Sequence, residues 1–336
     1  MRPLGWAIVG CGRVAENRMA PAVCSSPHAR LIGFCSRSIE RARAFAQRFD
    51  APLAADGLDA LVRDDRVDIV YVATPNHQHA EQTIACLAGG KHVITDKPMA
   101  LTVEDGRRMR EAARAARRTL GLCHQQRFHP AHTELFRLAA VGALGHLTVL
   151  RVEMGFVYAP APVWRQDRAL AGGGPGMDLA PHAVDILLQA AGPVSRVSGW
   201  VGNVRFDYGV EDVFLAQLEF ERGGLALLEM TYCSHSYGGR LEVRGDEGSY
   251  IVEGSLMASQ RYESRLLSGP SRTPVEIREA EFSDAFRMLV DDFSLAVRDG
   301  RDPSVTAEDG LSTLAAIAAA YDSARLGRPV VPAPVD

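Results

Sequence analysis

The first third of the chain alternates between two hydrophobic patterns. Short apolar runs typical of buried strands occur at residues 6–9, 31–35, 67–73, 92–95 and 120–123. Stretches with helical spacing of apolar residues separate them, at 14–22, 39–49, 81–89 and 103–117. Strands that alternate with helices predict a parallel sheet covered by helices on both faces. We therefore expect an N-terminal α/β domain over residues 1–123.

Beyond residue 123 the pattern changes to apolar and polar residues in alternation. Such segments occur at residues 147–157, 197–204, 213–220 and 225–232, followed by shorter ones at 241–244 and 249–252. Arg222-Gly223-Gly224 marks a hairpin turn, and helices are expected at 282–298 and 306–326. This pattern predicts an α+β domain over residues 124–336, with an open, mainly antiparallel sheet.

Helices are expected to cover one face of that second sheet. The opposite face, with Val149, Val152 or their neighbours, would then be free to pair with another subunit. We expect a homodimer or homotetramer formed through the C-terminal sheet.

Composition limits the class of protein. A chain of 336 residues that is 47% hydrophobic is long enough for two cores. Its net charge of −4, with acids and bases interspersed, disfavours a nucleic-acid partner. The six cysteines show no Cys-x-x-Cys pair and no metal-ligand spacing to a histidine, so we expect reduced thiols and no metal. Neither a leader nor an apolar run near the roughly 18 residues of a membrane span is found, which favours a cytoplasmic protein.

A glycine turn follows the first apolar run. Gly10-x-Gly12-x-x-Ala15 is a dinucleotide-binding pattern, in which the first glycine allows a tight turn and the second lets the backbone approach a pyrophosphate. Flavin and methyl-donor proteins share this turn, so the pattern alone leaves the cofactor open. In its context it predicts a Rossmann, doubly wound sheet. The residues expected to contact the dinucleotide here are Gly10, Cys11, Gly12, Arg13 and Val14.

The end of the second apolar run chooses between cofactors. An acidic residue there would bind the ribose 2'-hydroxyl of NAD(H), but the sequence is Cys35-Ser36-Arg37-Ser38 and no carboxylate precedes Glu40. Ser36 can donate to a 2'-phosphate, and the Arg37 guanidinium can pair with it. We therefore favour NADP(H), with NAD(H) as the alternative if Arg37 only solvates the start of a helix.

Three residues are candidates for proton transfer beside the cofactor. Moving a hydride to or from a carbinol carbon requires a group that gives or takes the hydroxyl proton, and an imidazole titrates near neutrality. His182 is the candidate, Asp178 can orient and stabilise it, and a buried Lys97 can polarise the reacting oxygen. Asp178, His182 and Asp185 are spaced to share one helix face, where Asp185 would orient His182 or close a structural hydrogen bond. The roles of Lys97 and His182 can be exchanged, and from spacing alone Asp178 can be a helix cap and His182 a core histidine.

Three further residues are candidates for contacts with the substrate. Trp164 and Arg165 lie in a Pro- and Gly-rich loop, and an aromatic face with a fork of donors suits a polyol. Arg127 follows the last strand of the first domain and can contact cofactor or substrate, or form an interdomain ion pair. We thus expect substrate contacts from Lys97, Arg127, Trp164, Arg165, Asp178 and His182.

Four ordered motifs together resemble the Gfo/Idh/MocA oxidoreductase family over essentially the whole chain. They are the Gly10 turn, Thr74-Pro75-Asn76 followed by His79, the segment from Gly90 to Pro98, and Gly172-Gly173-Gly174 with Asp178-x-x-x-His182-x-x-Asp185. The resemblance implies hydride transfer between a nicotinamide and a sugar or polyol carbon. Gly209-Val210-Glu211-Asp212 and the Trp164-Arg165 region look similar to the family's sugar-ketone reductases.

The resemblance also implies additional cofactor contacts, from Thr74, Pro75, Asn76, His79, Asp96, Lys97 and Arg127. One departure is notable, because the family usually has glutamate before the lysine and this chain has Asp96. A side chain shorter by one methylene alters how the cofactor ribose or Lys97 is held.

Three functions were weighed against these motifs. The first is an NAD(P)-dependent oxidoreductase acting on a sugar, polyol or related cyclic substrate. The second is a non-catalytic dinucleotide or sugar sensor, because a Rossmann domain can simply bind. The third, methyl transfer, has no support in the Lys97 segment. A sensor would not need Lys97, Asp178 and His182 together, so we favour the enzyme.

Overall fold

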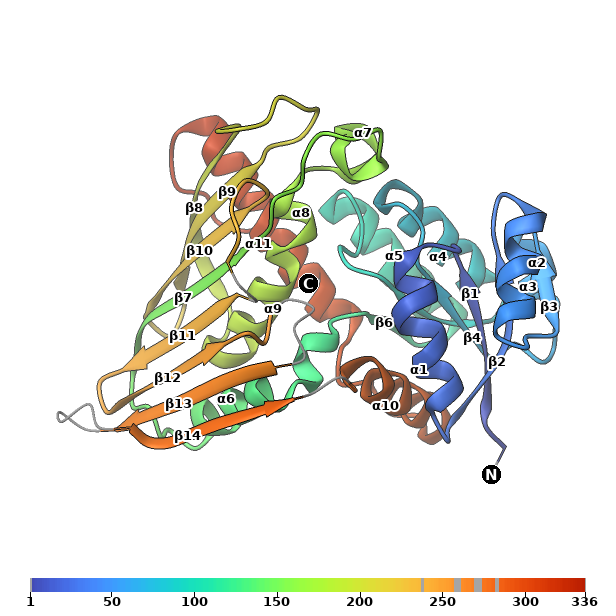
Figure 1. Ribbon diagram of the computed structural model, residues 1–336, viewed down its shortest axis with the longest axis horizontal. Helices are drawn as coiled ribbons and strands as arrows, with labels where there is room; N and C mark the ends of the chain where they lie inside the picture. Colours follow the sequence, from blue (N-terminus) through green and yellow to red (C-terminus); the bar gives the residue numbers. More distant parts are fainter. Residues whose placement is uncertain (1, 237–238, 257–260, 269–273, 282–283, 336) are drawn as a thin grey trace. The chain divides into compact units, whose positions relative to one another are not determined.

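The computed structural model describes residues 2–236, 239–256, 261–268, 274–281 and 284–335 (Figure 1). The chain forms two compact units. Unit 1 comprises residues 1–125 and 284–311, and unit 2 comprises residues 126–283 and 312–336. The division therefore falls within the last helix, α11 (Ala307–Leu326).

Unit 1 contains a six-stranded parallel sheet with the strand order β3-β2-β1-β4-β5-β6. This order is that of a doubly wound dinucleotide-binding sheet, as the alternating pattern predicts. Its strands are β1 (Leu4–Val9), β2 (Ala29–Cys35), β3 (Leu53–Ala55), β4 (Ile69–Val72), β5 (His92–Thr95) and β6 (Leu120–Leu122). The short strand β3 and the helix after it were not expected from the sequence.

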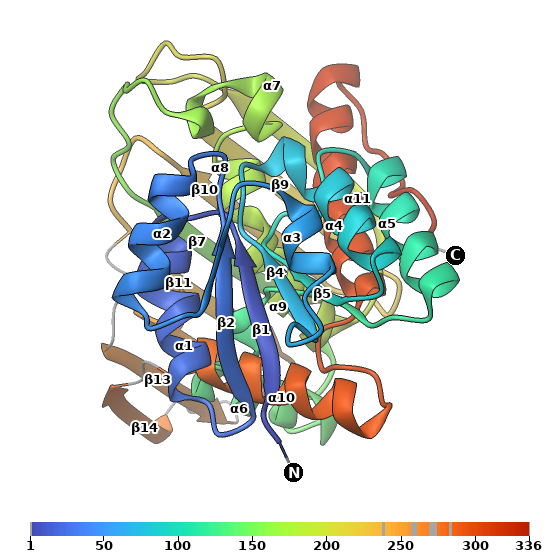
Figure 2. The ribbon, with the colours of Figure 1, turned by 90° about the vertical axis from the view of Figure 1, so that its right-hand side faces the viewer.

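Helices flank the unit 1 sheet on both sides. Figure 2 shows α1 and α2 on one side of β1 and β2, and α3, α4 and α5 on the other. The helices are η1 (Ala15–Met19), α1 (Ala20–Ser25), α2 (Ile39–Arg48), α3 (Leu58–Val62), η2 (Asn76–Gln78), α4 (His79–Ala88), α5 (Val103–Ala116) and α10 (Ala285–Asp299). Of the helix expected at 282–298, residues 282 and 283 lie outside the described residues.

Helix α10 belongs to unit 1 although it comes late in the chain. The Trp6 indole donates to Ser294 Oγ at 3.1 Å, and Ser26 Oγ donates to Asp291 at 2.5 Å. A single division after residue 123 does not anticipate this packing, because the contacts join segments more than 260 residues apart. That residues 1–123 and 124–336 are separate domains stays a prediction.

The carboxyl ends of the unit 1 strands lie in register at one edge of the sheet. Val9 pairs with both Cys35 and Val72, and Val72 pairs with Thr95. The residues that follow these strand ends therefore lie side by side, and ligands bind at this edge in doubly wound sheets. They are the Gly10 turn, Ser36-Arg37, the segment after Ala73, and Asp96-Lys97.

Unit 2 contains an eight-stranded mixed sheet with the strand order β14-β13-β12-β11-β7-β10-β9-β8. Its strands are β7 (Leu147–Gly155), β8 (Val194–Gly202), β9 (Val213–Phe220), β10 (Leu225–Thr231), β11 (Arg240–Gly245), β12 (Gly248–Glu253), β13 (Arg261–Ser268) and β14 (Pro274–Glu281). Six of the seven pairings are antiparallel, but β7 and β10 run parallel. The sheet is thus mainly antiparallel, as expected, and the parallel pair at its centre could not be inferred from alternation because both directions give the same period.

Helices α8 and α9 pack on one face of this sheet, as Figure 1 shows. The helices of this segment of the chain are η3 (Gln125–Phe128), α6 (Pro130–Ala140), η4 (Trp164–Gln166), α7 (Arg168–Ala171), α8 (Pro175–Asp178) and α9 (Ala180–Ala191). Val152 is fully buried, so the expectation that it lies on the free face is wrong. Val149 and Val152 differ by an odd number of residues, so they point to opposite faces of β7.

The other face of the sheet is partly apolar. Trp200 on β8, Leu215 on β9, and Leu225 and Leu227 on β10 are 38–50% exposed. Leu215 is the registered partner of Trp200, so the two side chains lie next to each other. These four residues form what we call the apolar half of the open face.

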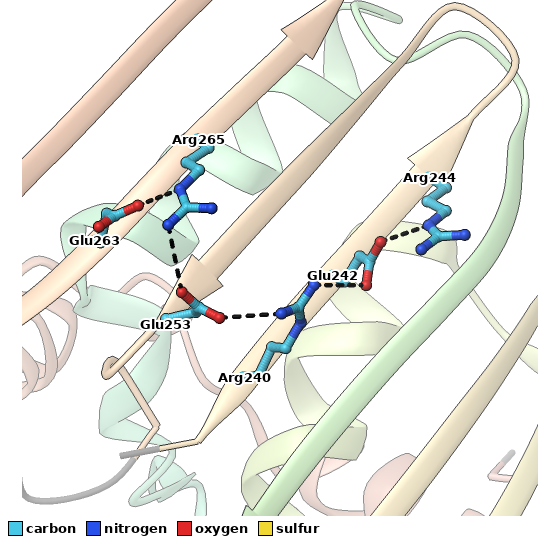
Figure 3. Close-up of polar contacts among 6 residues, drawn as sticks. All are labelled: Arg240, Glu242, Arg244, Glu253, Glu263 and Arg265. Carbon is cyan, nitrogen blue, oxygen red and sulfur yellow. Dashed lines mark hydrogen bonds and ion pairs between the residues drawn. The ribbon is translucent and has the colours of Figure 1, made fainter. Parts of the chain in front are cut away.

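Strands β11, β12 and β13 carry a charge ladder of six side chains on the open face, shown in Figure 3. Glu242 accepts from Arg244 at 2.5 Å and from Arg240 at 3.2 Å, and Arg240 also donates to Glu253 at 3.0 Å. Arg265 continues the ladder by pairing with Glu253 and Glu263. Burial acts to raise the pKa of Glu242, but the two guanidinium groups outweigh it and the pKa is lowered.

Candidate active site

The glycine turn after β1 is shaped for a dinucleotide. Gly10 has φ of +104°, and a Cβ there would lie 2.6 Å from the carbonyl oxygen of Ala73, so only glycine fits. No described atom lies within 4 Å of a Cβ placed on Gly12. This open side, at the start of a helix, is where a pyrophosphate can approach the backbone. The residues present therefore fit a dinucleotide.

Polar side chains that can bind the adenosine end lie beside this turn. Burial raises the pKa of the Cys11 thiol to about 11, while the Arg41 guanidinium and the Ser36 hydroxyl act in the opposite direction. The Gly10 N–H donates to the Cys35 carbonyl at 2.9 Å, so Ser36 directly follows a residue that contacts the turn. Arg37 is exposed, so its guanidinium is accessible to a ligand. Arg41, one helical turn beyond Arg37, is a further cation that was not expected to contact the cofactor.

His79 connects the segments that hold Lys97. Its Nδ1 lies 2.8 Å from the carbonyl oxygen of Pro98, and its Nε2 lies 2.9 Å from that of Thr74. Burial lowers the pKa of His79, while the charge of Asp96 and the two carbonyl contacts act to raise it. The residue therefore supports the loop after β5, and direct contact with the cofactor stays a prediction.

Lys97 directly follows Asp96 at the end of β5. The Lys97 backbone N–H donates to Asp96 Oδ1 at 2.9 Å, which fixes the backbone at the lysine. The carboxylate of Asp96, which is one methylene shorter than the family's glutamate, therefore accepts a hydrogen bond from the neighbouring backbone. Lys97 is half-buried rather than buried as expected.

Asp178 and His182 lie on two short helices instead of one. Asp178 ends α8, and α9 begins at Ala180. The interruption is explained by Pro181, which has no N–H to donate to the carbonyl of Met177. The shared helix face was thus wrong in detail, although Leu179 keeps helical dihedral angles and the His182 N–H donates to its carbonyl at 3.1 Å.

A tyrosine from the unit 2 sheet forms a hydrogen bond with the Asp178 side chain. The Tyr232 hydroxyl, directly after β10, donates to Asp178 Oδ2 at 2.8 Å. Burial, followed by the charge of Asp178, raises the pKa of Tyr232, while Arg165 acts to lower it. Tyr158 packs edge-on against Tyr232, with ring centroids 5.1 Å apart.

Trp164 and Arg165 form η4 and pack on each other. The Arg165 guanidinium lies 4.4 Å from the centre of the Trp164 ring. Trp164 lines a surface hollow together with Leu170 and Tyr208. Trp164 is thus placed at a concave surface with Arg165 packed on its ring, and contact of either residue with a substrate stays a prediction.

Arg127 and Asp185 form a buried ion pair. Arg127 Nε donates to Oδ1 and Oδ2 of Asp185 at 3.0 and 2.9 Å, and Nη2 donates to Oδ1 at 2.5 Å. The side chains are 8% and 0% exposed. Asp185 therefore closes a structural contact, one of the two roles expected for it. Binding of cofactor or substrate by Arg127 stays a prediction.

Sequence reasoning named Glu211 only within a motif similar to the family's sugar-ketone reductases and did not anticipate the contacts that surround Asp178. Tyr232 lies 54 positions away, and Glu211 and Tyr321 meet the glycine-rich turn before α8 from two other segments. No local pattern marks these contacts. In the described part of the chain, no helix is both long and apolar enough to span a bilayer, and no group of three His, Cys, Asp or Glu side chains is placed to hold a metal ion.

Comparison with known proteins gives two adjoining family matches. Residues 4–124 match the oxidoreductase family with an NAD-binding Rossmann fold, GFO_IDH_MocA. Residues 132–251 match the GFO/IDH/MocA C-terminal domain. The matches cover well over half of the chain.

Individual relatives extend the similarity to almost the whole length. The chain is 30% identical to 1,5-anhydro-D-fructose reductase of Ensifer adhaerens, over 96% of this chain and 97% of that protein. It is 28% identical to D-xylose 1-dehydrogenase (NADP(+)) 2 of Haloferax volcanii, over 97% and 98%. The crystal structure of aldose-aldose oxidoreductase from Caulobacter crescentus, complexed with glycerol, has a TM-score of 0.91 and 31% identity, and covers 98% of this chain and 100% of that one. The glycine turn, the strand order and these matches agree: the chain belongs to the Gfo/Idh/MocA family of NAD-binding oxidoreductases.

Proposed function

We propose that this protein is an NADP(H)-dependent oxidoreductase that moves a hydride between the nicotinamide and a carbinol or ketone carbon of a sugar or polyol. The observation that carries the proposal is the arrangement around Asp178, which lies four residues before His182 and accepts a hydrogen bond from the Tyr232 hydroxyl. The similarity to named sugar reductases and dehydrogenases supports the substrate class.

The residues of this chain handle the proton and the developing charge. The nicotinamide, when bound, supplies or accepts the hydride. His182 takes the hydroxyl proton during oxidation and returns it during reduction. Asp178 stabilises the charged imidazole, and the Lys97 ammonium donates a hydrogen bond to the reacting oxygen. Trp164 and Arg165 bind the ring and the remaining hydroxyl groups of the substrate.

Two substitutions test these assignments. Lys97→Met and His182→Ala should each abolish turnover and leave the cofactor dissociation constant nearly unchanged. Arg63→Met and His146→Ala, both at exposed positions, serve as matched controls. Turnover is first found by screening sugars, inositols and ketosugars for NADPH oxidation and NADP reduction. Wild-type rates in both catalytic variants would refute the mechanism, and cofactor binding with no turnover on any substrate would favour a sensor.

The preference for NADP(H) rests on Ser36 and Arg37. Both residues follow β2, and no carboxylate lies between the end of this strand and Glu40. Arg41 adds a second cation one helical turn beyond Arg37. Relatives do not decide the question, because the Haloferax enzyme is named for NADP whereas the WlbA dehydrogenase from Bordetella pertussis, 26% identical, was crystallised with NADH. Kinetics with both cofactors test the preference, and equal or better use of NAD(H) would overturn it.

The second proposal concerns assembly, a homodimer or homotetramer formed through the open face of the unit 2 sheet. The apolar half of this face places four partly exposed apolar side chains on β8, β9 and β10, next to Gln217, Glu219 and Glu229 in the strand register, and such side chains are expected at the centre of an interface. The charge ladder already pairs its own side chains, so it suits the polar rim. Light scattering should give a multiple of 36.4 kDa, and Leu227→Glu should lower the mass. A monomeric wild type would refute the proposal.

A further inference from the structure

Glu211 is a buried acid that the proposed reaction does not use. It lies in the segment before β9, and the residue is 2% exposed. Its Oε1 atom accepts three hydrogen bonds: from the Gly174 N–H at 2.8 Å, from the Gly176 N–H at 3.2 Å, and from the Tyr321 hydroxyl at 2.6 Å. One carboxylate oxygen thus joins the glycine-rich turn to helix α11.

The turn is packed directly against Glu211 and Tyr321. A Cβ on Gly174 would lie 2.0 Å from the Glu211 carbonyl oxygen, and one on Gly176 would lie 2.4 Å from the Tyr321 hydroxyl. Neither distance is possible for a real side chain, so both positions require glycine. The contact therefore fixes where the backbone of the turn lies, and it does so through a buried carboxyl group and a half-buried tyrosine.

Any shift of the turn is passed on to Asp178. Helix α8 is four residues long, and the Asp178 N–H donates to the Gly174 carbonyl at 3.0 Å. The Tyr232 hydroxyl also restrains Asp178, through the side chain and not the backbone. The backbone position of Asp178 thus depends on the contacts made at Gly174.

We propose that Glu211 and Tyr321 are positioning residues that place Asp178 for its action on His182. This inference rests on the proposed function. Neither side chain touches the reacting atoms, and both act through the turn from Gly174 to Asp178. Misplacing a catalytic group by about 1 Å costs roughly 10²-fold in rate, and two backbone N–H groups that donate to the same carboxyl oxygen provide a rigid attachment.

The test compares Glu211→Ala, Glu211→Gln and Tyr321→Phe with Asp178→Asn. The first should lower kcat by about 10²-fold, with the cofactor dissociation constant unchanged. The glutamine variant should recover most of kcat, because its amide oxygen can accept the same three hydrogen bonds. Glu221→Ala, at an exposed position of the same unit, should match the wild type.

Two readouts separate positioning from a general loss of structure. In the oxidation direction, Glu211→Ala and Tyr321→Phe should move the acid limb of the kcat profile to lower pH, as Asp178→Asn does, because the charged imidazole loses its partner. The Glu211→Ala and Asp178→Asn substitutions should also be non-additive, since one acts through the other. If Glu211→Ala fails to fold, Tyr321→Phe, which keeps the ring, gives the same readouts.

Each result decides the inference. Unchanged kcat and pH profiles in Glu211→Ala and Tyr321→Phe, or fully additive losses with Asp178→Asn, would overturn the positioning role while leaving the proposed function intact. Wild-type activity in Asp178→Asn would overturn both.

Discussion

The buried pair of Arg127 and Asp185 allows a quantitative prediction. Arg127→Met removes a guanidinium that makes three hydrogen bonds to a carboxylate whose side chain is 0% exposed. Removing one partner of such a pair costs about 3–5 kcal/mol, because the remaining charge stays out of water. We therefore expect the free energy of unfolding to fall by about that amount. Replacing both, as Arg127→Met with Asp185→Leu, should recover much of the loss, because apolar residues of similar volume replace buried pairs at little cost.

Urea unfolding followed by circular dichroism measures the effect. The matched control is Arg196→Met, whose ion pair with Glu219 has the same chemistry but is 53% exposed at the arginine, so it should cost less than about 1 kcal/mol. The reasoning is refuted if Arg127→Met is no more destabilising than Arg196→Met. A loss of cofactor or substrate affinity in a stably folded Arg127→Met would instead support the binding role expected from sequence.

Three further predictions follow from the same contacts. Tyr232→Phe removes the hydrogen bond to Asp178 and should lower kcat about tenfold, the equivalent of about 1.4 kcal/mol, with cofactor affinity by fluorescence quenching unchanged. Arg37→Ala should raise the dissociation constant for NADPH about tenfold and leave that for NADH nearly constant, if a charge-assisted hydrogen bond to the 2'-phosphate is lost; equal changes for both cofactors would contradict the assignment. Burial lowers the pKa of His132 to about 3, below its value of about 6.5 in unfolded chains, so the unfolded state binds more protons between these values and stability should fall as pH drops below about 6.5. His132→Gln should flatten this dependence in urea titrations, and an equally steep fall in that variant would exclude His132 as its cause.

The sequence was sufficient to predict the part of the fold that repeats a local pattern. Gly10 and Gly12 follow an apolar run, and both the glycine turn and the order of the parallel sheet agree with what that run and its successors indicate. The alternating segments likewise predict β7 to β12 of unit 2, whereas β13 and β14 were not expected from the sequence. The family resemblance also holds, because its motifs are short and lie at fixed places along the chain.

The remainder depends on contacts between distant segments. Alternation gives the same signal for parallel and antiparallel neighbours, so the pairing of β7 with β10 was not predictable. Placing Val152 on the correct face required knowing which alternate residues of β7 point to the core. The break between α8 and α9 was signalled only by Pro181. Tyr232 and Glu211 support Asp178 across 54 and 33 positions, a separation that periodicity cannot bridge.

The most direct test of the central claim follows the hydride itself. Wild-type protein is incubated with NADPH carrying deuterium at the transferable position of the nicotinamide and with a ketosugar that the screen identifies, and the product is examined by mass spectrometry. The account predicts one deuterium on the carbon that bore the ketone, and no labelled product with Lys97→Met or His182→Ala. An unlabelled reduced product, or labelled product from both variants at the wild-type rate, would contradict it.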